Sequence, residues 1–448
     1  MPRSLLNLPF LFETARDFAR ASDYFLLATQ NAARAFAYQE AILLTRKGLK
    51  VTNRLPEGPE RALKELALET TLGGLLIVTK GRADLEVEKA YARARDLCGQ
   101  VEDSPHLFTA LRGLSEFYHT RRGELETARQ LAEQALLLAE RLQDTTLIVD
   151  AHHAVSMPLI YLGELTLAQQ HLKQGIALYR PEQHRLYTDL YPDIDHGVGC
   201  RFQMARASWL LGYPDQALRH SYEGIVLAEK LAHPISLAWI HALAAIIHGF
   251  RREAQKTQEH GETAIALCRE YGFEEPLGWA TTWLGWARAK QGNSREGIDQ
   301  IREGLALNPH HSLRPHVLAL LAEVLADAHR VEEGLTVLAE ALETVRTGGR
   351  YYHSELCHLK GTLLLMQSET NAMEAHGCLH EALQIARRQN ARALELRAAV
   401  SLGRLYRKQG KNEEARGILT PIYSWFTEGL ETADLTEAKV LLEQVSSG

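Results

Sequence analysis

The stretch that decides the fold is LGRLYRKQGKNEEARGIL, which occupies residues 402–419. Small and aromatic residues recur in it at the spacing of two packed helices joined by a tight turn. Gly403 allows the two helices to approach closely, and Tyr406 fills the space between them. Gly410 ends the first helix, and the small Ala415 lies where the second helix crosses the first. The stretch therefore predicts a helical hairpin.

The same frame recurs along the chain with a period near 40 residues. The predicted helix crossings are 37 to 49 residues apart, at Ala128, Ala168, Ala217, Ala254, Gly297, Gly334, Ala375 and Ala415. This pattern is typical of tetratricopeptide repeats (TPRs), whose units bury their apolar faces only against their neighbours. We therefore predict an all-α, TPR-like α-solenoid of about ten antiparallel helix pairs in a right-handed superhelix.

Residues 1–448 are predicted to form a single array. Apolar residues recur at three- and four-residue steps, and no stretch alternates long enough to predict a strand. The longest irregular stretch is the 180–200 loop, RPEQHRLYTDLYPDIDHGVGC. Long loops within a regular array are often functional, so this loop is a possible sub-boundary and a candidate site.

Composition and charge describe an ordinary folded protein of mildly acidic character. Apolar residues make up 46% of the chain, charged residues make up 24%, and the formal net charge is −6. Basic residues are interspersed with acidic ones and form no stripe, which argues against nucleic acid as a partner. The five cysteines are scattered without a CxxC pair, which is typical of reduced thiols in a cytoplasmic protein.

Two apolar segments could be mistaken for targeting or membrane signals. Residues 5–12 are apolar, but no small-residue cleavage site follows them, which argues against a signal peptide. Residues 231–250 lack a formally charged side chain but include His233, Pro234 and His241, which are unfavourable in lipid. We predict a buried helix there, and a cytoplasmic protein without a membrane partner.

Four stretches resemble a known family: TKGRADLEVEKAYARARDLC (79–98), WLLGYPDQAL (209–218), FRREAQKTQE (250–259) and YSWFTEGLETADLTEAKVLLE (423–443). They make the chain similar to the C-terminal TPR region of bacterial signalling proteins that combine a class III adenylate/guanylate cyclase domain with a STAND ATPase. The array also resembles those of LuxR-type regulators of the maltose-activator kind. The resemblance implies a sensor or regulatory arm, with a STAND ATPase or cyclase module as a partner in cis or in trans.

The chain departs from that family because it lacks the catalytic signatures. No G-x-x-x-x-G-K-[ST] phosphate-binding loop occurs, and neither a cyclase motif nor a helix-turn-helix accompanies the array. We therefore do not expect ATPase or cyclase activity of this chain. We expect a fragment, a truncated gene product or a stand-alone TPR protein.

Twenty histidines make a metal site worth considering. His353 and Cys357 on one predicted helix, and His376 and His380 on the next, have the i, i+4 spacing that places two ligands on one face. In the TPR frame, however, Cys378 and His380 lie on the outward side of the second helix, away from the first. We predict no metal site and no cofactor.

The 180–200 loop also combines acid, base and nucleophile types in Asp193, His196 and Cys200. Nucleophilic catalysis needs a positioned triad and an oxyanion donor, and nothing in the sequence supplies that context. We predict no catalytic residue and do not expect an enzyme.

Certain positions on the first helix of each pair are predicted to face the concave groove, the usual recognition surface of such arrays. These candidate binding residues are His153, Phe202, Arg206, Trp209, Trp239, Trp286, Glu323 and Arg404. Trp and Arg dominate binding energy when they are buried against a partner, although a single Trp can equally fill a gap between repeats. As a set, they predict a groove with an aromatic centre and mixed charge.

Two functions fit this groove. The first is a protein-interaction scaffold that binds a protein or peptide segment through helix-in-groove contacts. The alternative is a small-molecule effector sensor, with the ligand held between the 180–200 loop and the groove. A groove open along its length favours the first function, and a closed cavity under the loop favours the second.

Overall fold

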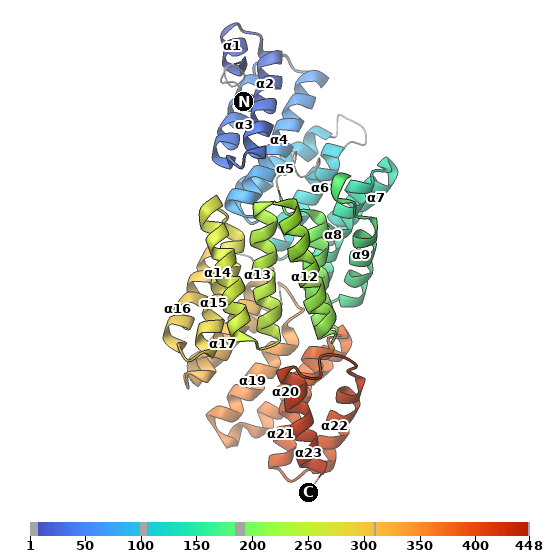
Figure 1. Cartoon of the computed structure of the whole chain (residues 1–448), viewed down its shortest axis with the longest axis vertical. Coiled ribbons are helices and arrows are strands. Elements are labelled where there is room, and N and C mark those ends of the chain that lie inside the picture. Colours follow the sequence, from blue (N-terminus) through green and yellow to red (C-terminus); the bar gives the residue numbers. More distant parts are fainter. Residues whose placement is uncertain (1–7, 99–104, 184–192, 309–310, 347, 447–448) are drawn as a thin grey trace.

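The computed structural model describes residues 8–98, 105–183, 193–308, 311–346 and 348–446. These residues form helices joined by turns, and no strand occurs among them. The helices follow one another as antiparallel pairs in an elongated stack with the termini at opposite ends (Figure 1). The predicted all-α, TPR-like solenoid is thereby confirmed.

The described helices form ten consecutive pairs, flanked by α1 (Leu8–Thr14) and α23 (Ala433–Ser446). The pairs are α2 (Phe18–Arg34) with α3 (Tyr38–Thr52), α4 (Pro59–Lys80) with α5 (Leu85–Cys98), α6 (Pro105–Phe117) with α7 (Leu125–Leu142), α8 (Thr145–Leu162) with α9 (Leu165–Leu178), α11 (His196–Leu210) with α12 (Pro214–Leu231), α13 (Pro234–Phe250) with α14 (Ala254–Tyr271), α15 (Glu274–Lys290) with α16 (Ser294–Leu307), α17 (Arg314–Asp327) with α18 (Val331–Val345), α19 (His353–Gln367) with α20 (Ala372–Gln389), and α21 (Arg392–Lys408) with α22 (Asn412–Trp425).

A simple local rule shapes most of these pairs. A residue with positive φ follows the first helix of the pair. Five positions later, on the second helix, a small residue packs where the two helices cross. The clearest cases are Gly123 and Ala128, Gly163 and Ala168, Gly212 and Ala217, Gly292 and Gly297, and Gly410 and Ala415. Glycine adopts positive φ at little cost, and all four of these alanines are fully buried. These positions agree with the predicted frame.

One predicted crossing position is wrong. Ala254 begins α14 and is only half-buried. In this pair Arg252 has positive φ (62°), and Thr257, five residues later, is fully buried. The sequence pattern did not reveal these two positions, because neither Arg nor Thr is typical of them in the repeat.

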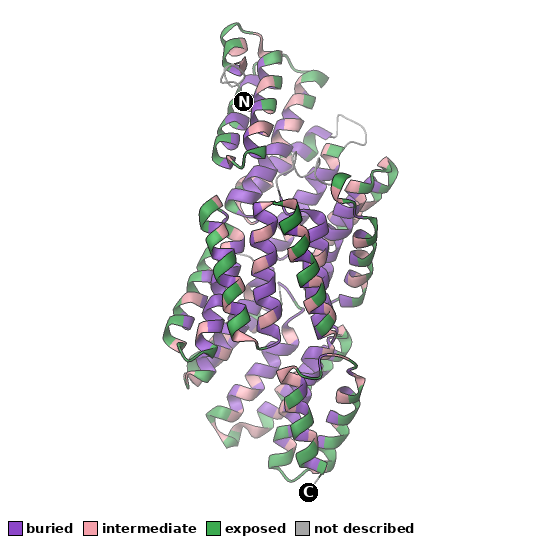
Figure 2. Ribbon diagram, viewed as in Figure 1, coloured by how far each residue is buried: buried purple, intermediate pink, exposed green. Residues whose placement is uncertain are grey.

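The first helix of each pair lies in an inner layer and the second in an outer layer. In α13, 14 of 17 residues are buried, whereas α14 buries five of 18. Figure 2 shows the exposed residues gathered on outer helices such as α12, α14 and α16. Within the charge-free segment 231–250, residues 234–250 form the largely buried helix α13, as predicted. Among the described residues, no helix has the length and apolar character needed to cross a membrane.

The array coils tightly enough that distant segments touch. The Arg82 guanidinium, just beyond α4, pairs with Glu275 at the start of α15. The hydroxyl of Ser312, in the short 3₁₀ turn η3 (His311–Leu313), donates to the His119 carbonyl in the π-helical turn η2 (Tyr118–Arg122). The backbone N–H of Arg350 donates to the carbonyl of Tyr161 at 2.6 Å, a contact that joins the start of α19 to the end of α8. These contacts close the inner face in the middle of the array.

Replacing Gly113 with alanine tests the close packing of α4, α5 and α6. The Tyr91 ring lies between Gly73 and Gly113, and a Cβ on Gly113 would be 2.2 Å from the ring carbon Cε2 of Tyr91. Tyr91 is 1% exposed, and its ring lies in close contact with both glycines. We expect Gly113→Ala to lower the free energy of unfolding by about 1–3 kcal/mol, measured by urea denaturation followed by circular dichroism.

Gly417→Ala in α22 is the matched control, because a Cβ on Gly417 meets nothing within 4 Å. Alanine there is expected to leave stability unchanged or to raise it by up to about 1 kcal/mol, since it has the higher helix propensity. Equal effects of the two substitutions would contradict the packing argument.

Candidate functional site

The structure places seven of the eight predicted groove residues in two sites on the inner face. Those that line a small central cavity are His153, Phe202, Arg206 and Trp239. Those that line a larger groove in the C-terminal half are Trp286, Glu323 and Arg404. Trp209 lines neither: its ring stacks on Phe250 with centroids 4.1 Å apart, and the Arg397 guanidinium lies 4.9 Å from it. Six of the eight are buried, Glu323 is half-buried and Arg404 is exposed.

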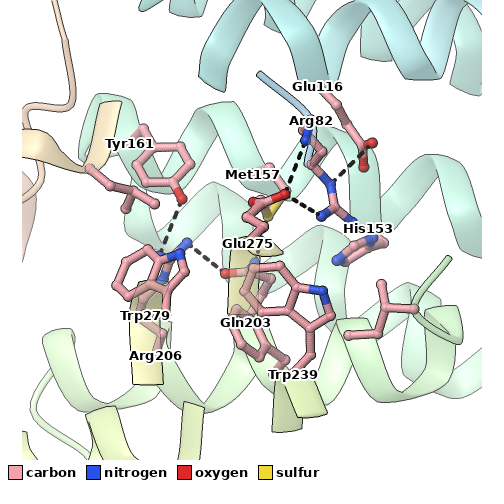
Figure 3. Close-up of a pocket in the computed structure, with 13 residues that line it drawn as sticks. Arg82, Glu116, His153, Met157, Tyr161, Gln203, Arg206, Trp239, Glu275 and Trp279 are labelled. Carbon is pink, nitrogen blue, oxygen red and sulfur yellow. Dashed lines mark hydrogen bonds and ion pairs between the residues drawn. The ribbon is translucent and has the colours of Figure 1, made fainter. Parts of the chain in front are cut away.

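The central cavity has a volume of about 40 Å³ and mixes aromatic rings with charged groups (Figure 3). Its lining residues are Arg82, Glu116, His153, Met157, Tyr161, Ile194, Phe202, Gln203, Arg206, Trp239, Glu275, Trp279 and Leu313. Ile194 belongs to the 180–200 loop, so the cavity adjoins the part of that loop that is described. Residues 184–192 of the loop lie outside the described residues.

Arg82 is the most heavily paired group of the cavity wall. Its guanidinium lies 3.2 Å from Glu116 in α6, 2.7 Å from Asp193 before α11, and 3.1 Å from Glu275 in α15. All four side chains are less than 10% exposed. A guanidinium tolerates burial when carboxylates surround it in this way. The three carboxylates come from different helix pairs, so Arg82 ties these parts of the coil together.

Arg112 forms a second centre of the same buried network. It lies 2.7 Å from Asp150, 2.6 Å from Asp193 and 3.2 Å from Glu116. Asp193 thus bridges Arg82 and Arg112. Burial alone would raise the pKa of Asp193, but the two guanidinium groups hold it below its usual range.

The remaining polar residues near the start of α11 also have structural partners. Asp195 caps α11 by accepting a hydrogen bond from the Val198 N–H at 3.1 Å, and it accepts another from the Tyr179 hydroxyl at 3.0 Å. The Nε2 atom of His196 lies 3.2 Å from Asp150. Cys200 is fully buried, and burial raises the pKa of its thiol.

Arg206 is surrounded differently from Arg82 and Arg112. Its Nη2 donates to the side-chain oxygen of Gln203 at 2.6 Å, and its Nη1 donates to the Tyr161 hydroxyl at 3.5 Å (Figure 3). Its guanidinium carbon lies 5.0 Å from the Tyr161 ring centroid and 5.6 Å from that of Tyr351. These partners are neutral groups.

Three buried histidines lie on or near the same inner face. The pKa of His119, His153 and His316 is lowered to about 3, mainly by burial and in smaller part by neighbouring positive groups. For His119 these groups are arginines, as they are for His316. All three side chains are therefore neutral in the folded protein at pH 7.

The C-terminal groove is larger, at about 510 Å³, and lies across the first helices of the last four pairs. Its lining residues are Arg252, Ala254, Trp286, Lys290, Glu323, Asp327, His358, Thr362, Arg397, Val400, Ser401, Arg404, Asp434 and Glu437. The Trp286 indole N–H donates to Glu323 at 3.2 Å, and Arg404 donates to Glu437 at 3.3 Å. Two of the three predicted residues in this groove are thus joined directly, although they lie on different pairs.

Two groups of potential metal ligands occur among the described residues. In the first, ligand atoms of Asp150, His153 and His196 lie within 4.8 Å of one another, and all three residues are buried. Arg112 donates to Asp150 at 2.7 Å, so a cation of the protein already occupies one side of this carboxylate. This competition disfavours a divalent ion.

The second group contains part of the histidine and cysteine pattern noted in the sequence. His353 and Cys357 converge with Glu381, with ligand atoms within 4.8 Å of one another. His376 instead hydrogen-bonds the Tyr406 hydroxyl at 3.0 Å. Burial raises the pKa of Cys357 to about 12, so the thiolate that binds metal is scarce at neutral pH.

The buried ion network was not found from the sequence. One local signal was present in FTALRGLSEF (108–117), where Arg112 and Glu116 stand four residues apart within an otherwise uncharged helix. Such a pair either faces solvent or meets further charges inside. Periodicity does not distinguish these cases, because the other partners, Asp150, Asp193 and Glu275, lie in remote parts of the chain.

The buried histidines predict that the protein loses stability on acidification. Their pKa is about 3 when folded and about 6.5 in the unfolded chain, so the unfolded chain binds more protons between these values. Their contribution is complete above pH 6.5 and falls below it by roughly 1.4 kcal/mol per pH unit for each histidine. We expect the urea midpoint to drop between pH 7.5 and pH 5.5.

His316→Gln should reduce this pH dependence, because it removes one of the buried histidines whose pKa is lowered by folding. His380→Gln, at an exposed position in α20, is the control and should leave the slope unchanged. An unchanged urea midpoint between the two pH values in the wild-type protein would show that the histidines are not held neutral by burial.

Comparison with known proteins reveals a likeness of fold. No family model matches the sequence, and no curated protein matches it. The crystal structure of a Rap protein complexed with competence and sporulation factor aligns over 88% of this chain and 99% of its own, with a TM-score of 0.53 and 13% identity.

Two further solved structures align with lower scores. The apo form of RapI aligns over 95% of this chain and 99% of its own, with a TM-score of 0.41 and 13% identity. A STAND protein with a TPR sensor from Pyrococcus horikoshii aligns over 89% and 67%, with a TM-score of 0.36 and 14% identity. At these identities the likeness concerns fold alone. The chain is a TPR-like, all-helical repeat protein, and its fold is typical of protein-interaction scaffolds.

Proposed function

We propose that the chain is a protein-interaction module that binds an extended protein or peptide segment in the C-terminal groove. The observation that carries this proposal is the groove itself, which spans the first helices of four consecutive pairs and has a volume of about 510 Å³. Its wall combines the buried apolar side chains of Trp286 and Val400 with the exposed Arg404. A docked segment would meet an apolar floor and a charged rim, the usual anatomy of a peptide site.

The charges of the groove indicate what kind of segment fits. Four basic and four acidic side chains line it, and they pair with one another. The pairs are Lys290 with Glu323 and Asp327, Arg252 with Asp434 and Glu437, Arg397 with Asp434, and Arg404 with Glu437. Arg252 and Arg404 are exposed and share Glu437, and solvent-exposed pairs contribute little to stability, so a charged group of a partner can replace a member of these two pairs at small loss. A segment that carries both signs of charge around an apolar anchor would complement this wall.

The closed middle of the array limits where such a segment can bind. His153, Phe202, Arg206 and Trp239 surround a cavity of only about 40 Å³, which is too small for a peptide. The proposal therefore retains Trp286, Glu323 and Arg404 from the predicted groove. The remaining predicted residues support the peptide site only indirectly, through the packing of the inner layer.

The solved Rap structure is consistent with a binding role. That protein shares this fold over almost its whole length and is complexed with competence and sporulation factor. We extend only the general role to the present chain, since 13% identity does not identify a partner.

A binding role also agrees with how the candidate catalytic groups are used. Asp193 is engaged by Arg82 and Arg112, and His196 lies against Asp150. Burial raises the pKa of Cys200, which disfavours a nucleophilic thiolate. We therefore propose that the chain is not an enzyme.

The sequence resemblance extends the proposal to signalling. A segment bound in the groove would bias a STAND ATPase or cyclase module, in cis or in trans, between inactive and active states. Such a shift requires that the segment bind one state of the array more tightly than the other. The groove provides a basis for this difference, because it is built from several pairs that would have to keep their spacing while the segment is bound.

Peptide display against the purified chain tests the groove. Peptides selected on the wild-type protein are expected to lose at least about tenfold in affinity to Thr362→Arg, since a long side chain would occupy the groove. Arg404→Glu is expected to produce a similar loss, because it reverses a rim charge that is exposed in the free protein. Affinities would be measured by calorimetry.

Arg346→Glu is the matched control for charge reversal, because Arg346 is exposed and does not line the groove. Its affinity for the selected peptides should equal that of the wild type. Peptides that bind Thr362→Arg and Arg404→Glu as tightly as the wild type would remove the groove as the binding site.

A further inference from the structure

Arg206 is a buried guanidinium whose charge no described carboxylate neutralises. Arg206 is 2% exposed. No carboxylate oxygen of the described residues lies within 4.0 Å of its guanidinium nitrogens, the limit for an ion pair. Its hydrogen-bond partners, Gln203 and Tyr161, are neutral, and its Nε has no acceptor among the described residues. Arg82, in the same cavity wall, is paired with three carboxylates. The contrast shows that the fold can neutralise a buried arginine here and leaves Arg206 without such a partner.

An uncompensated buried charge strongly destabilises a folded protein. The rings of Tyr161 and Tyr351, at 5.0 and 5.6 Å, provide cation–π attraction, which is weaker than an ion pair. A water molecule could accept a hydrogen bond from Nε but would leave the charge in place. A bound anion satisfies both requirements.

A second donor without an acceptor lines the same cavity. The indole N–H of Trp279 is buried and has no hydrogen-bond partner among the described residues. An indole nitrogen and a guanidinium nitrogen can only donate, so Trp279 and Arg206 both require an acceptor. Figure 3 shows both side chains in the cavity wall. A carboxylate offers several acceptor positions on two oxygens, enough for both donors.

The acids that line the cavity do not meet this requirement. Glu116 and Glu275 each lie within 3.2 Å of Arg82. Burial also raises the pKa of Glu116, so its negative charge is weakened by its surroundings. The two acids are therefore engaged by Arg82, and neither accepts a hydrogen bond from Arg206 Nε or the Trp279 indole N–H.

We propose that the central cavity binds a small molecule through a carboxylate group that accepts hydrogen bonds from Arg206 and Trp279. A cavity of about 40 Å³ holds roughly three or four water-sized groups, which matches a carboxylate on a short stem. Phe202 and Trp239 provide the apolar wall for that stem. The source is either a short monocarboxylic acid or a small α-amino acid, whose ammonium group would face Glu116 and Glu275. This site is separate from the C-terminal groove, and neither proposal requires the other.

Ligand-linked stability tests the proposal on the full chain. Acetate, propionate, glycine and alanine are titrated at constant ionic strength, with chloride and inorganic phosphate as comparison anions. We expect a saturable rise of the thermal unfolding midpoint with the acids or with the amino acids, together with a change in tryptophan fluorescence, because Trp239 and Trp279 line the cavity. The more effective set of probes identifies the source of the carboxylate.

Two variants connect the response to the proposed donors. Arg206→Met should abolish the response and, without ligand, should unfold at or above the wild-type temperature, because it removes a buried charge. Trp279→Phe should weaken binding roughly tenfold, since it removes one hydrogen-bond donor and keeps the ring. Trp283→Phe is the matched control: its indole N–H also lacks a partner among the described residues but does not line the cavity, so affinity should be unchanged.

Three results would overturn the proposal. The first is an unchanged midpoint with all four carboxylate probes. The second is an equal response to chloride or phosphate, which would indicate general anion stabilisation. The third is an Arg206→Met protein that unfolds well below the wild type in the absence of ligand, which would show that the protein itself already satisfies this arginine.

Discussion

Closure of the inner face around Arg82 is the constraint on which the rest of the structure depends. Its guanidinium binds Glu116, Asp193 and Glu275, which belong to three separate parts of the chain. Each carboxylate is buried against the same guanidinium, so the three segments that supply them are held in place together. In a plain solenoid each unit contacts only its neighbours. The network adds a connection across the coil, and Arg82, Glu116 and Glu275 line the small central cavity.

The fold could be predicted because its determinants are local. Gly410 and Ala415 lie in one hairpin, and the same five-residue step recurs at Gly163, Gly212 and Gly292. Each hairpin forms by its own turn and crossing, so the sequence pattern repeats with the structure. The prediction failed at Ala254 because Arg252 and Thr257 perform the same two roles with untypical side chains. This hairpin has the same backbone conformation and burial at the two positions as the other repeats, but different residue types.

The site could be predicted only in part, because it depends on how the coil closes. The repeat frame predicted that His153, Arg206 and Trp239 face an inner groove, and in the structure all three line the small central cavity. Their burial was not predicted, since it arises from contacts such as Arg82 with Glu275. Those contacts depend on small rotations summed over many pairs, which no local pattern records. The repeat pattern therefore predicts which face of the array a residue lies on, but it does not predict whether that face is exposed to solvent.

Arg206 and Arg404 show what this difference means for function. Both are inward-facing arginines on the first helix of a pair, and the sequence treats them alike. Arg404 is exposed and shares Glu437 with Arg252, so water and neighbouring charges screen it, and it can exchange partners readily. Arg206 is buried among neutral hydrogen-bond partners, so solvent screens its charge less, and its attraction for an anion in the cavity is stronger. The same side chain therefore suits a reversible peptide rim at one end of the array and a selective small-anion site in its middle.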